Sequence, residues 1–278
     1  MDQIDDSYRI GIRRSCSLMG LHRSAYYYKS TGRRDDTAIK LRMKEIVETR
    51  VRYGSPRVYT LLRREGYFVN HKRVERIYRE QGYSLRNKRP KRRVSPEHRS
   101  PSTDCTKLDE AWAMDFVSDA LFNGRRIRAL TVVDIFSREA LAIRVGMKLT
   151  GLDVIETLEE IGRQRGLPNR IKSDNGTEFT SLGYDKWPYE KGITTDYSRR
   201  GKPTDNGTIE RFNGSLRDEC LNVNWFLSLE DACEKIEEWR QDYNRFRPHS
   251  SLNDMTPADF AARHRGENSA LLAGLVSG

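Results

Sequence analysis

Three acidic residues have the type and the spacing to carry out chemistry, and each stands in a segment with a clear secondary-structure signal. They are Asp115 in WAMDFVSD, Asp174 in IKSDNGTEF and Glu210 in DNGTIERFNG. Between them lie 58 residues (174 − 115 − 1) and 35 residues (210 − 174 − 1). Mg²⁺ prefers oxygen ligands, and two such ions can activate a water or a 3′-hydroxyl and stabilise the leaving oxygen of a phosphodiester. If the fold brings the three acids together, the sequence predicts two-metal chemistry on nucleic acid.

The rest of the composition narrows the class of protein. The four cysteines form no C-x-x-C pair and the five histidines are scattered, so any metal should be a hard ion on oxygen ligands. The mean hydropathy is −0.79, and no apolar run approaches the roughly 18 residues of a membrane span. The opening MDQIDDSYRIGIRR has no apolar stretch typical of a signal peptide. We therefore expect a cytoplasmic protein without a membrane segment.

Positive charge is concentrated in the first part of the chain. Residues 1–107 contain 27 Lys and Arg against 12 Asp and Glu, a net charge of +15 (27 − 12). Residues 108–278 contain 23 against 28, a net charge of −5 (23 − 28). Basic segments attract nucleic-acid phosphates, whereas acidic side chains can collect a cation. This division predicts that DNA binding and chemistry lie in different parts of the chain.

Residues 33–85 carry signals typical of a helix-turn-helix. Asn70 can cap a short helix with Val74 and Ile77 on its apolar stripe, and Gly82 can end it. The basic residues outside that stripe are Lys72, Arg73, Arg76 and Arg79. A basic second helix could enter the major groove of DNA. An ordinary charged helical hairpin is the alternative.

A basic linker is predicted over residues 86–107. It combines three prolines, several serines and a cluster of positive charge, without apolar periodicity. The cluster comprises Arg89, Lys91, Arg92 and Arg93. These side chains could follow a DNA backbone, and a solvated tether is the alternative. Upstream of both regions, residues 1–30 are expected to form a small helical segment.

After the linker, the hydrophobic period becomes that of strands. A helix is expected over 153–166, and strands are expected over 110–121, 126–137, 138–145, 170–174 and 193–197. Three consecutive strands followed by alternating helix and strand specify an α/β fold with a mixed sheet.

In such a mixed sheet, the three acids are expected to lie at one site. Asp115 lies within the first strand and Asp174 at the end of the fourth, where side chains can reach an open edge. Glu210 lies on a helix beside its buried stripe. Arg217, seven residues later, shares its side of the helix and could contact a phosphate.

This ordered set of segments resembles the DDE transposases and retroviral integrases, and most closely the second-frame (OrfB) polypeptide of two-frame bacterial insertion sequences. The segment YGSPRVYTLLRREGYFVNHKRVERIYREQGY is similar to the family's helix-turn-helix region. WAMDFVSD, TVVDIFSRE, SDNGTEF and DNGTIERFNGSLRDE resemble its catalytic motifs, and YNRFRPHSSLNDMTPADF resembles its C-terminal signature. The resemblance covers about residues 10–262.

The resemblance implies an RNase H-like catalytic core with Asp115, Asp174 and Glu210 as its catalytic and metal-binding triad. It also implies dependence on Mg²⁺ or Mn²⁺, with two ions expected when DNA is bound. The implied activity is DNA strand cleavage and strand transfer during transposition of an insertion sequence.

Partners and location follow from the same resemblance. The implied partners are double-stranded DNA, as terminal inverted repeats and target, and further copies of this chain in a homo-oligomer on that DNA. An upstream-frame (OrfA) protein, or a frameshift fusion with it, is a further implied partner. The expected location is the bacterial cytoplasm, in association with the nucleoid.

The expected domain limits complete the prediction. The integrase-type catalytic core is predicted over 108–225, a C-terminal helical extension over 226–263 and a flexible tail over 264–278. Within the core, three neighbouring acids are expected to contact the metal ligands or to cap turns, with direct contact to the metal as the alternative: Asp119, Asp134 and Glu178.

Two other functions are compatible with part of the sequence. A stand-alone RNase H-like nuclease would share the metal chemistry but leave the basic region less well explained. A non-catalytic helix-turn-helix regulator would explain the basic helices but leave the three spaced acids without a role. A recombinase with a Ser or Tyr nucleophile is disfavoured, because no activated hydroxyl surrounded by arginines stands out.

Overall fold

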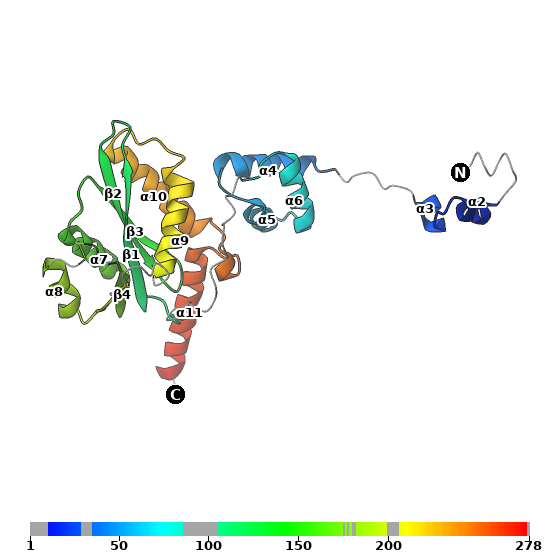
Figure 1. Cartoon of the computed structure of the whole chain (residues 1–278). Helices are drawn as coiled ribbons and strands as arrows, with labels where there is room; N and C mark the ends of the chain where they lie inside the picture. Colours follow the sequence, from blue (N-terminus) through cyan, green and yellow to red (C-terminus); the bar gives the residue numbers. More distant parts are fainter. Residues whose placement is uncertain are drawn as a thin grey trace. The chain divides into compact units, whose positions relative to one another are not determined.

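The computed structural model of this chain describes residues 11–28, 35–85, 105–174, 176, 178–179, 182–198 and 206–276. Contacts divide the chain into a small unit, Met1–Leu41, and a larger unit, Arg42–Gly278. In the small unit, helices α2 (Ile12–Leu18) and α3 (Arg23–Tyr27) contact each other (Figure 1). The larger unit carries the elements that position the candidate site.

Three helices precede the sheet: α4 (Thr37–Thr49), α5 (Ser55–Arg64) and α6 (His71–Glu80). The Asn70 side chain caps α6 by accepting a hydrogen bond from the amide of Lys72 at 2.9 Å. Val74 and Ile77 of α6 are fully buried, and α6 contacts α5. The short helix predicted from the Asn70 cap and the apolar periodicity is therefore present, packed against a second helix.

A five-stranded mixed sheet forms the centre of the larger unit. Its strands are β1 (Ala111–Ala120), β2 (Arg126–Asp134), β3 (Ala140–Gly146), β4 (Arg170–Ser173) and β5 (Thr194–Tyr197). The spatial order is β3-β2-β1-β4-β5. The pairs β1–β2 and β2–β3 are antiparallel, whereas β1–β4 and β4–β5 are parallel. The α/β fold with a mixed sheet is thus confirmed.

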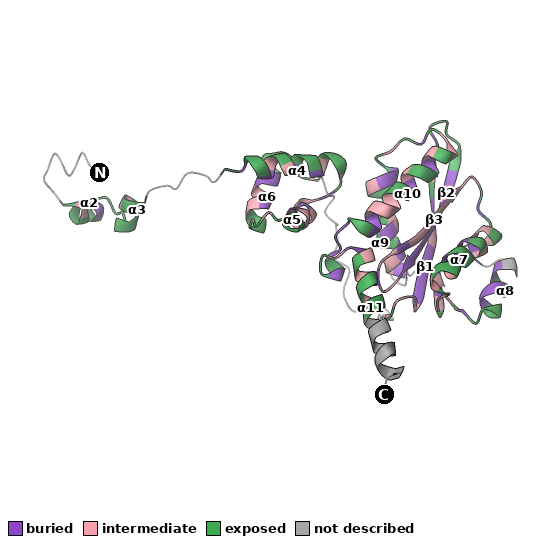
Figure 2. Cartoon of the chain, turned by 180° about the vertical axis from the view of Figure 1, so that it is seen from behind, coloured by how far each residue is buried: buried purple, intermediate pink, exposed green. Residues whose placement is uncertain are grey.

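Helices cover both faces of this sheet, and the alternation of β1 assigns each side chain to a face. Trp112 and Met114 pack into one hydrophobic cluster with residues of α7 (Gly151–Arg165) and α8 (Leu182–Glu190). Ala113 and Val117 pack on the opposite face, in clusters with α9 (Gly207–Leu216) and α10 (Leu229–Arg245). Figure 2 shows the strands buried between these helices. Because alternate residues share a face, Asp115 lies on the α9 side.

Asn244 of α10 joins the second layer to edge strand β3. Its amide nitrogen donates to the carbonyl oxygen of Ala140 at 2.9 Å, and its amide oxygen accepts from the Ala140 amide at 2.8 Å. The strand ladder shifts register here, between Val132 and Val133 of β2. Asn244 therefore satisfies backbone groups at an irregular point of the sheet edge.

The chain after α9 continues as helical turns. A π-helix, η3 (Arg217–Leu221), follows α9 directly, and a 3-10 turn, η4 (Ser250–Leu252), precedes α11 (Pro257–Val276). The sequence predicts a flexible tail over 264–278, whereas α11 continues through this segment to Val276. Within the described part of the chain, no helix combines the length and the apolar character that a membrane crossing requires.

Candidate active site

Asp115 stands at the middle of β1, half-buried on the face that α9 covers. Its Oδ1 accepts a hydrogen bond from the amide of Phe116 at 2.7 Å. Its Oδ2 accepts one from the side-chain amide of Asn213 at 2.9 Å. The carboxylate is therefore held in one orientation by a strand and by a helix.

Asn213 is itself held by the neighbouring strand. Thr131 is directly opposite Asp115 in the β1–β2 ladder. Its hydroxyl oxygen lies 2.9 Å from the side-chain amide oxygen of Asn213. A carboxylate only accepts hydrogen bonds, so the amide nitrogen of Asn213 must face Asp115 and its oxygen must face Thr131. The sequence pattern alone does not select Asn213 as a site residue, and the available signal is its i, i+3 spacing from Glu210.

Asp174 follows β4 and is exposed. The parallel register pairs Ala113 with Lys172, and continuing it by two residues places Asp174, just past the end of β4, alongside Asp115. The amide of Gly176 donates to Oδ1 of Asp174 at 3.0 Å. A Cβ placed on Gly176 would lie 3.0 Å from that oxygen, so the close approach favours glycine.

Glu178 lies near Asp174 but has a cationic partner. It forms an ion pair with Arg128 of β2, whose guanidinium lies over the ring of Phe116 at 4.3 Å from its centroid. A Cβ on Gly176 would lie 3.4 Å from Oε2 of Glu178, which places this carboxylate beside the same turn as Asp174. The contacts of Glu178 thus tie the turn after β4 to β2.

Glu210 occupies the first turn of α9 and is exposed. Its helix lies on the Asp115 side of the sheet, contacting both β1 and β2. Arg217 is also exposed, and its guanidinium lies 3.4 Å from the carbonyl oxygen of Ser118 on β1. The sequence places Arg217 on α9, whereas the structure places it at the first residue of η3.

The three acids share one electrostatic environment. Burial raises the pKa of Asp115, and the charges of Asp174 and Glu210 raise it further, while the hydrogen bonds from Phe116 and Asn213 act in the opposite direction. Among the described residues, no three His, Cys, Asp or Glu side chains stand close enough together to hold a metal ion as they are. The charges of Asp174 and Glu210 therefore act on Asp115, although the three carboxylates do not close into a tight cluster.

The other two neighbouring acids lie in different surroundings. Asp119 shares the α9 face of β1 with Asp115, and burial, followed by the charge of Asp119, raises the pKa of Cys220 in η3. Asp134 is paired with Trp112 in the ladder and so faces the opposite layer of the sheet.

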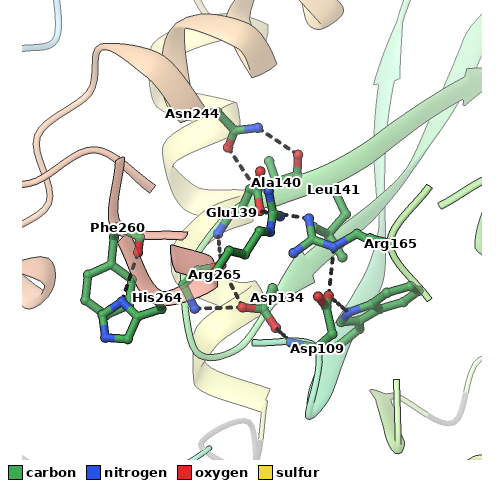
Figure 3. Close-up of polar contacts among 12 residues, drawn as sticks. Asp109, Asp134, Glu139, Ala140, Leu141, Arg165, Asn244, Phe260, His264 and Arg265 are labelled. Carbon is green, nitrogen blue, oxygen red and sulfur yellow. Dashed lines mark hydrogen bonds and ion pairs between the residues drawn. The ribbon is translucent and has the colours of Figure 1, made fainter. Parts of the chain in front are cut away.

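Asp134 acts within a buried polar network at the end of β2 (Figure 3). Its carboxylate accepts hydrogen bonds from the amide and hydroxyl of Ser137 at 2.7 and 2.6 Å, and from the amide of Asp109 at 3.2 Å. Asp109 in turn pairs with Arg165 of α7 at 2.8 Å. This arrangement favours the turn-capping alternative for Asp134.

The predicted DNA-binding residues are only partly described. On α6, Arg76 and Arg79 form ion pairs within the helix, with Glu80 and Glu75 respectively. Lys72 is exposed at its first turn. The linker residues lie outside the described part of the chain: Arg89, Lys91, Arg92 and Arg93.

Family models match three segments of the chain. An integrase core domain matches residues 106–203, a second integrase core domain model matches residues 191–257, and an HTH-like domain matches residues 33–93. The integrase core matches contain Asp115, Asp174 and Glu210, and the HTH-like match contains the hairpin of α5 and α6.

Relatives match over most of the chain. An uncharacterized 31.7 kDa protein of insertion element IS407 from Burkholderia multivorans is 43% identical over 265 residues, covering 95% of each chain. An uncharacterized protein of insertion element IS476 from Xanthomonas euvesicatoria is 41% identical, over 91% of this chain and 73% of its own. The putative transposase InsK of insertion sequence IS150 from Escherichia coli is 28% identical, over 86% of this chain and 89% of its own.

A solved structure shares the fold. A chain in the cryo-EM structure of the simian T-cell lymphotropic virus intasome with PP2A regulatory subunit B56 gamma superposes with a TM-score of 0.52. The match covers 79% of this chain and 73% of that chain at 17% sequence identity. The same arrangement of strands and helices thus occurs in a protein of very different sequence.

Proposed function

This chain belongs to the insertion-element transposases that carry an HTH-like domain and an integrase core domain, and from that premise we propose that Asp115, Asp174 and Glu210 are its catalytic acids. Its function is that of a DDE transposase, an enzyme acting on DNA strands. The observation that supports the residue assignment is geometric: the β1–β4 register carries Asp174 toward Asp115, and α9, which bears Glu210, donates to Asp115 through Asn213.

The three carboxylates fit a divalent metal by their chemistry. All are oxygen donors, and they come from three separate elements, which suits the octahedral demands of Mg²⁺ or Mn²⁺. Asp174 and Glu210 are exposed, whereas Asp115 is half-buried and held by hydrogen bonds from Phe116 and Asn213. We propose that Asp115 is the fixed ligand, with two ions bound when DNA is present. When bound, such ions activate the attacking oxygen and stabilise the leaving oxygen.

The chain's own residues would orient the reacting strand. Asn213 holds one oxygen of Asp115 by a hydrogen bond from α9, and Gly176 leaves room for Asp174 at the turn after β4. Exposed Arg217, next to β1, is placed to contact a phosphate of the DNA strand. The same site can serve strand cleavage and strand transfer, because both reactions displace an oxygen at phosphorus in line.

The HTH-like domain supports binding to double-stranded DNA. We propose that Lys72, Arg73, Arg76 and Arg79 of α6, with the basic linker, contact the terminal inverted repeats, and that the protein acts as a homo-oligomer on that DNA at the bacterial nucleoid. An upstream-frame (OrfA) protein, alone or as a frameshift fusion, is proposed as a partner. One observation supports the fusion, since the Xanthomonas relative extends beyond the matched 73% of its length.

A joining assay tests this function against its two alternatives. The full chain is incubated with Mg²⁺ and labelled duplex DNA carrying the ends of its element, with a supercoiled target. A transposase yields nicked ends and strands joined to the target. Nicking without joining would favour the stand-alone nuclease, and binding without either product would favour the regulator.

A further inference from the structure

A pocket opens on the side of α9 away from the candidate catalytic acids. Thr208, Arg211 and Ser215 share one side of the helix through their i, i+3 and i+7 spacing, whereas Glu210 and Asn213 share another. The pocket has a volume of about 220 Å³, and its polar lining comes from α9, from the turn after β2, and from α10 and the chain that follows it. Among the described residues that line it, none is Asp or Glu.

Arg138 enters this pocket from a strained turn. Its φ of 62° lies in the left-handed region, which costs a non-glycine residue roughly 1 kcal/mol. Two sets of hydrogen bonds to Asp134 fix this turn. The Asp134 carboxylate accepts hydrogen bonds from Ser137, and the Asp134 backbone carbonyl accepts one from the amide of Arg138 at 3.0 Å. Strain retained in this way is typical of functional positions.

The Arg138 guanidinium has a hydroxyl for a partner and no carboxylate. It donates to Oγ1 of Thr208 at 2.6 Å, and no ion pair to Arg138 occurs among the residues that the structure describes. Burial, and then the charge of Arg211, lower the pKa of Arg138, whereas Tyr243 and Asp134 act in the opposite direction. Buried cations are usually paired with a carboxylate, but the guanidinium of Arg138 contacts a hydroxyl instead.

Arg247 completes the positive lining. It is 6% exposed and is held by two hydrogen bonds to Glu219, both at 2.9 Å, and one to Ser215 at 2.9 Å. Glu219 also pairs with Arg57 at 2.8 Å, so one carboxylate serves two guanidinium groups. Arg211 is exposed and has no hydrogen bond or ion pair within the described chain. Positive charge at the pocket therefore exceeds negative charge.

We propose that this pocket binds a phosphate-class oxyanion, and that its occupant in the working enzyme is a backbone phosphate of DNA. Arg138 and Arg211 would supply the charge, and Thr208 and Ser215 the hydroxyl donors, as phosphate sites require. The DNA strand would then be held on both sides of α9, at the acids and at this pocket. The assignment of DNA as the occupant rests on the proposed function. The pocket also gives a role to two sequence segments, TVVDIFSRE with Arg138 and YNRFRPHSS with Arg247.

The test measures binding in the full-length chain with Asp115→Asn, so that no chemistry is involved. Arg211→Gln and Arg138→Gln are compared with Arg163→Gln, an exposed arginine of α7 on the other face of the sheet. Affinity for element-end duplex DNA is measured across a salt series. Each pocket variant should weaken binding by about 3–10-fold and reduce the slope of log K against log salt by about one, as expected for one lost phosphate contact. Arg163→Gln should change neither.

A second experiment tests whether the pocket binds free phosphate or a phosphate of DNA. Inorganic phosphate should raise the unfolding midpoint of the parent protein, and it should raise that of Arg138→Gln less. If phosphate stabilises the parent but DNA affinity and salt slope stay unchanged in both variants, DNA is not the occupant and that half of the proposal is overturned. If neither effect appears, the whole proposal is overturned.

A folding defect, or a failure of the proposed function, can be distinguished from a failure of the pocket proposal. Arg211 is exposed, so its variant should keep the parent's circular dichroism and unfolding midpoint even if Arg138→Gln does not. A failure of the unmodified chain to join strands would contradict the proposed function, while the binding measurements would still test the pocket.

Discussion

Asn213 donates a hydrogen bond to Oδ2 of Asp115 at 2.9 Å while the hydroxyl of Thr131 lies 2.9 Å from its amide oxygen. Thr131 is the cross-strand partner of Asp115, so the three side chains form a closed link between β1, β2 and α9. Within this link, Asn213 fixes the direction in which the Asp115 carboxylate points. Asn213 is therefore a positioning residue in this site.

Replacing Asn213 by alanine should reduce strand joining about 10–100-fold, the usual effect of removing a group that orients a metal ligand. Because the ligand itself is retained, part of the loss should be recovered at higher Mg²⁺ or Mn²⁺ concentration. The measurement is joining rate against metal concentration, with the exposed Asn222→Ala as control. A rate and a metal dependence equal to those of the parent would show that Asn213 does not position Asp115.

Gly176→Ala tests the close approach of the turn to Asp174. A Cβ there would meet Oδ1 of Asp174 at 3.0 Å, which displaces that carboxylate by a few tenths of an ångström. Joining should fall by roughly 10-fold, since misplacement of a catalytic group is costly. Gly214→Ala in α9 is the matched control, because its Cβ would have nothing within 4 Å, and it should not lower the unfolding midpoint. Full activity in Gly176→Ala would contradict the close approach.

Acid should destabilise the fold through His249. Burial, followed by the charges of Arg247, Arg57, Arg138 and Arg64, lowers the pKa of His249 from 6.5 to about 3. The pKa of His249 is lower in the folded protein than in the unfolded chain. The stability that the neutral His249 contributes is therefore complete above pH 6.5 and is lost as the pH falls toward 3. Between pH 6.5 and 5, about 2 kcal/mol should be lost.

The measurement for His249 is the free energy of unfolding in urea at several pH values between 7 and 5. His249→Gln cannot take up this proton, so it should lose most of the dependence in that range. An equal slope in parent and variant would mean that His249 is not held neutral by its surroundings.

Asn244→Ala should destabilise the protein by about 2–3 kcal/mol, because it leaves the buried amide of Ala140 without its partner at the irregular sheet edge. Urea unfolding measures the change. Asn222→Ala should stay within about 0.5 kcal/mol of the parent. If Asn244→Ala also stayed within that margin, the link between α10 and β3 would not contribute to stability.

The regular parts of the fold follow from local patterns. Apolar alternation predicts the strands near Asp115 and Asp174, and helical periodicity with the Asn70 cap predicts α6. Helix α8 is not predicted, because Pro188 interrupts a weak apolar pattern within it.

The candidate site was predictable only in part. Side-chain type and spacing select the three acids, but they do not show which acids face each other. Asp134 and Asp115 lie on opposite faces of the sheet, and this depends on strand register. The pairing of Glu178 with Arg128 joins positions 50 residues apart in sequence, and the Arg138 pocket joins three separate segments. Such contacts arise from tertiary packing, which a local pattern does not encode.

The most direct measurement is strand joining by a series of amide variants made in the full chain. Asp115→Asn, Asp174→Asn and Glu210→Gln should each lower joining by at least about 1,000-fold, as expected when a transition-state charge partner is lost, with DNA binding intact. The matched variants Asp119→Asn, Asp134→Asn and Glu178→Gln should keep measurable joining. An acid of the first set that tolerates the change, or one of the second set that abolishes joining without loss of folding, would contradict the assignment of the three catalytic acids.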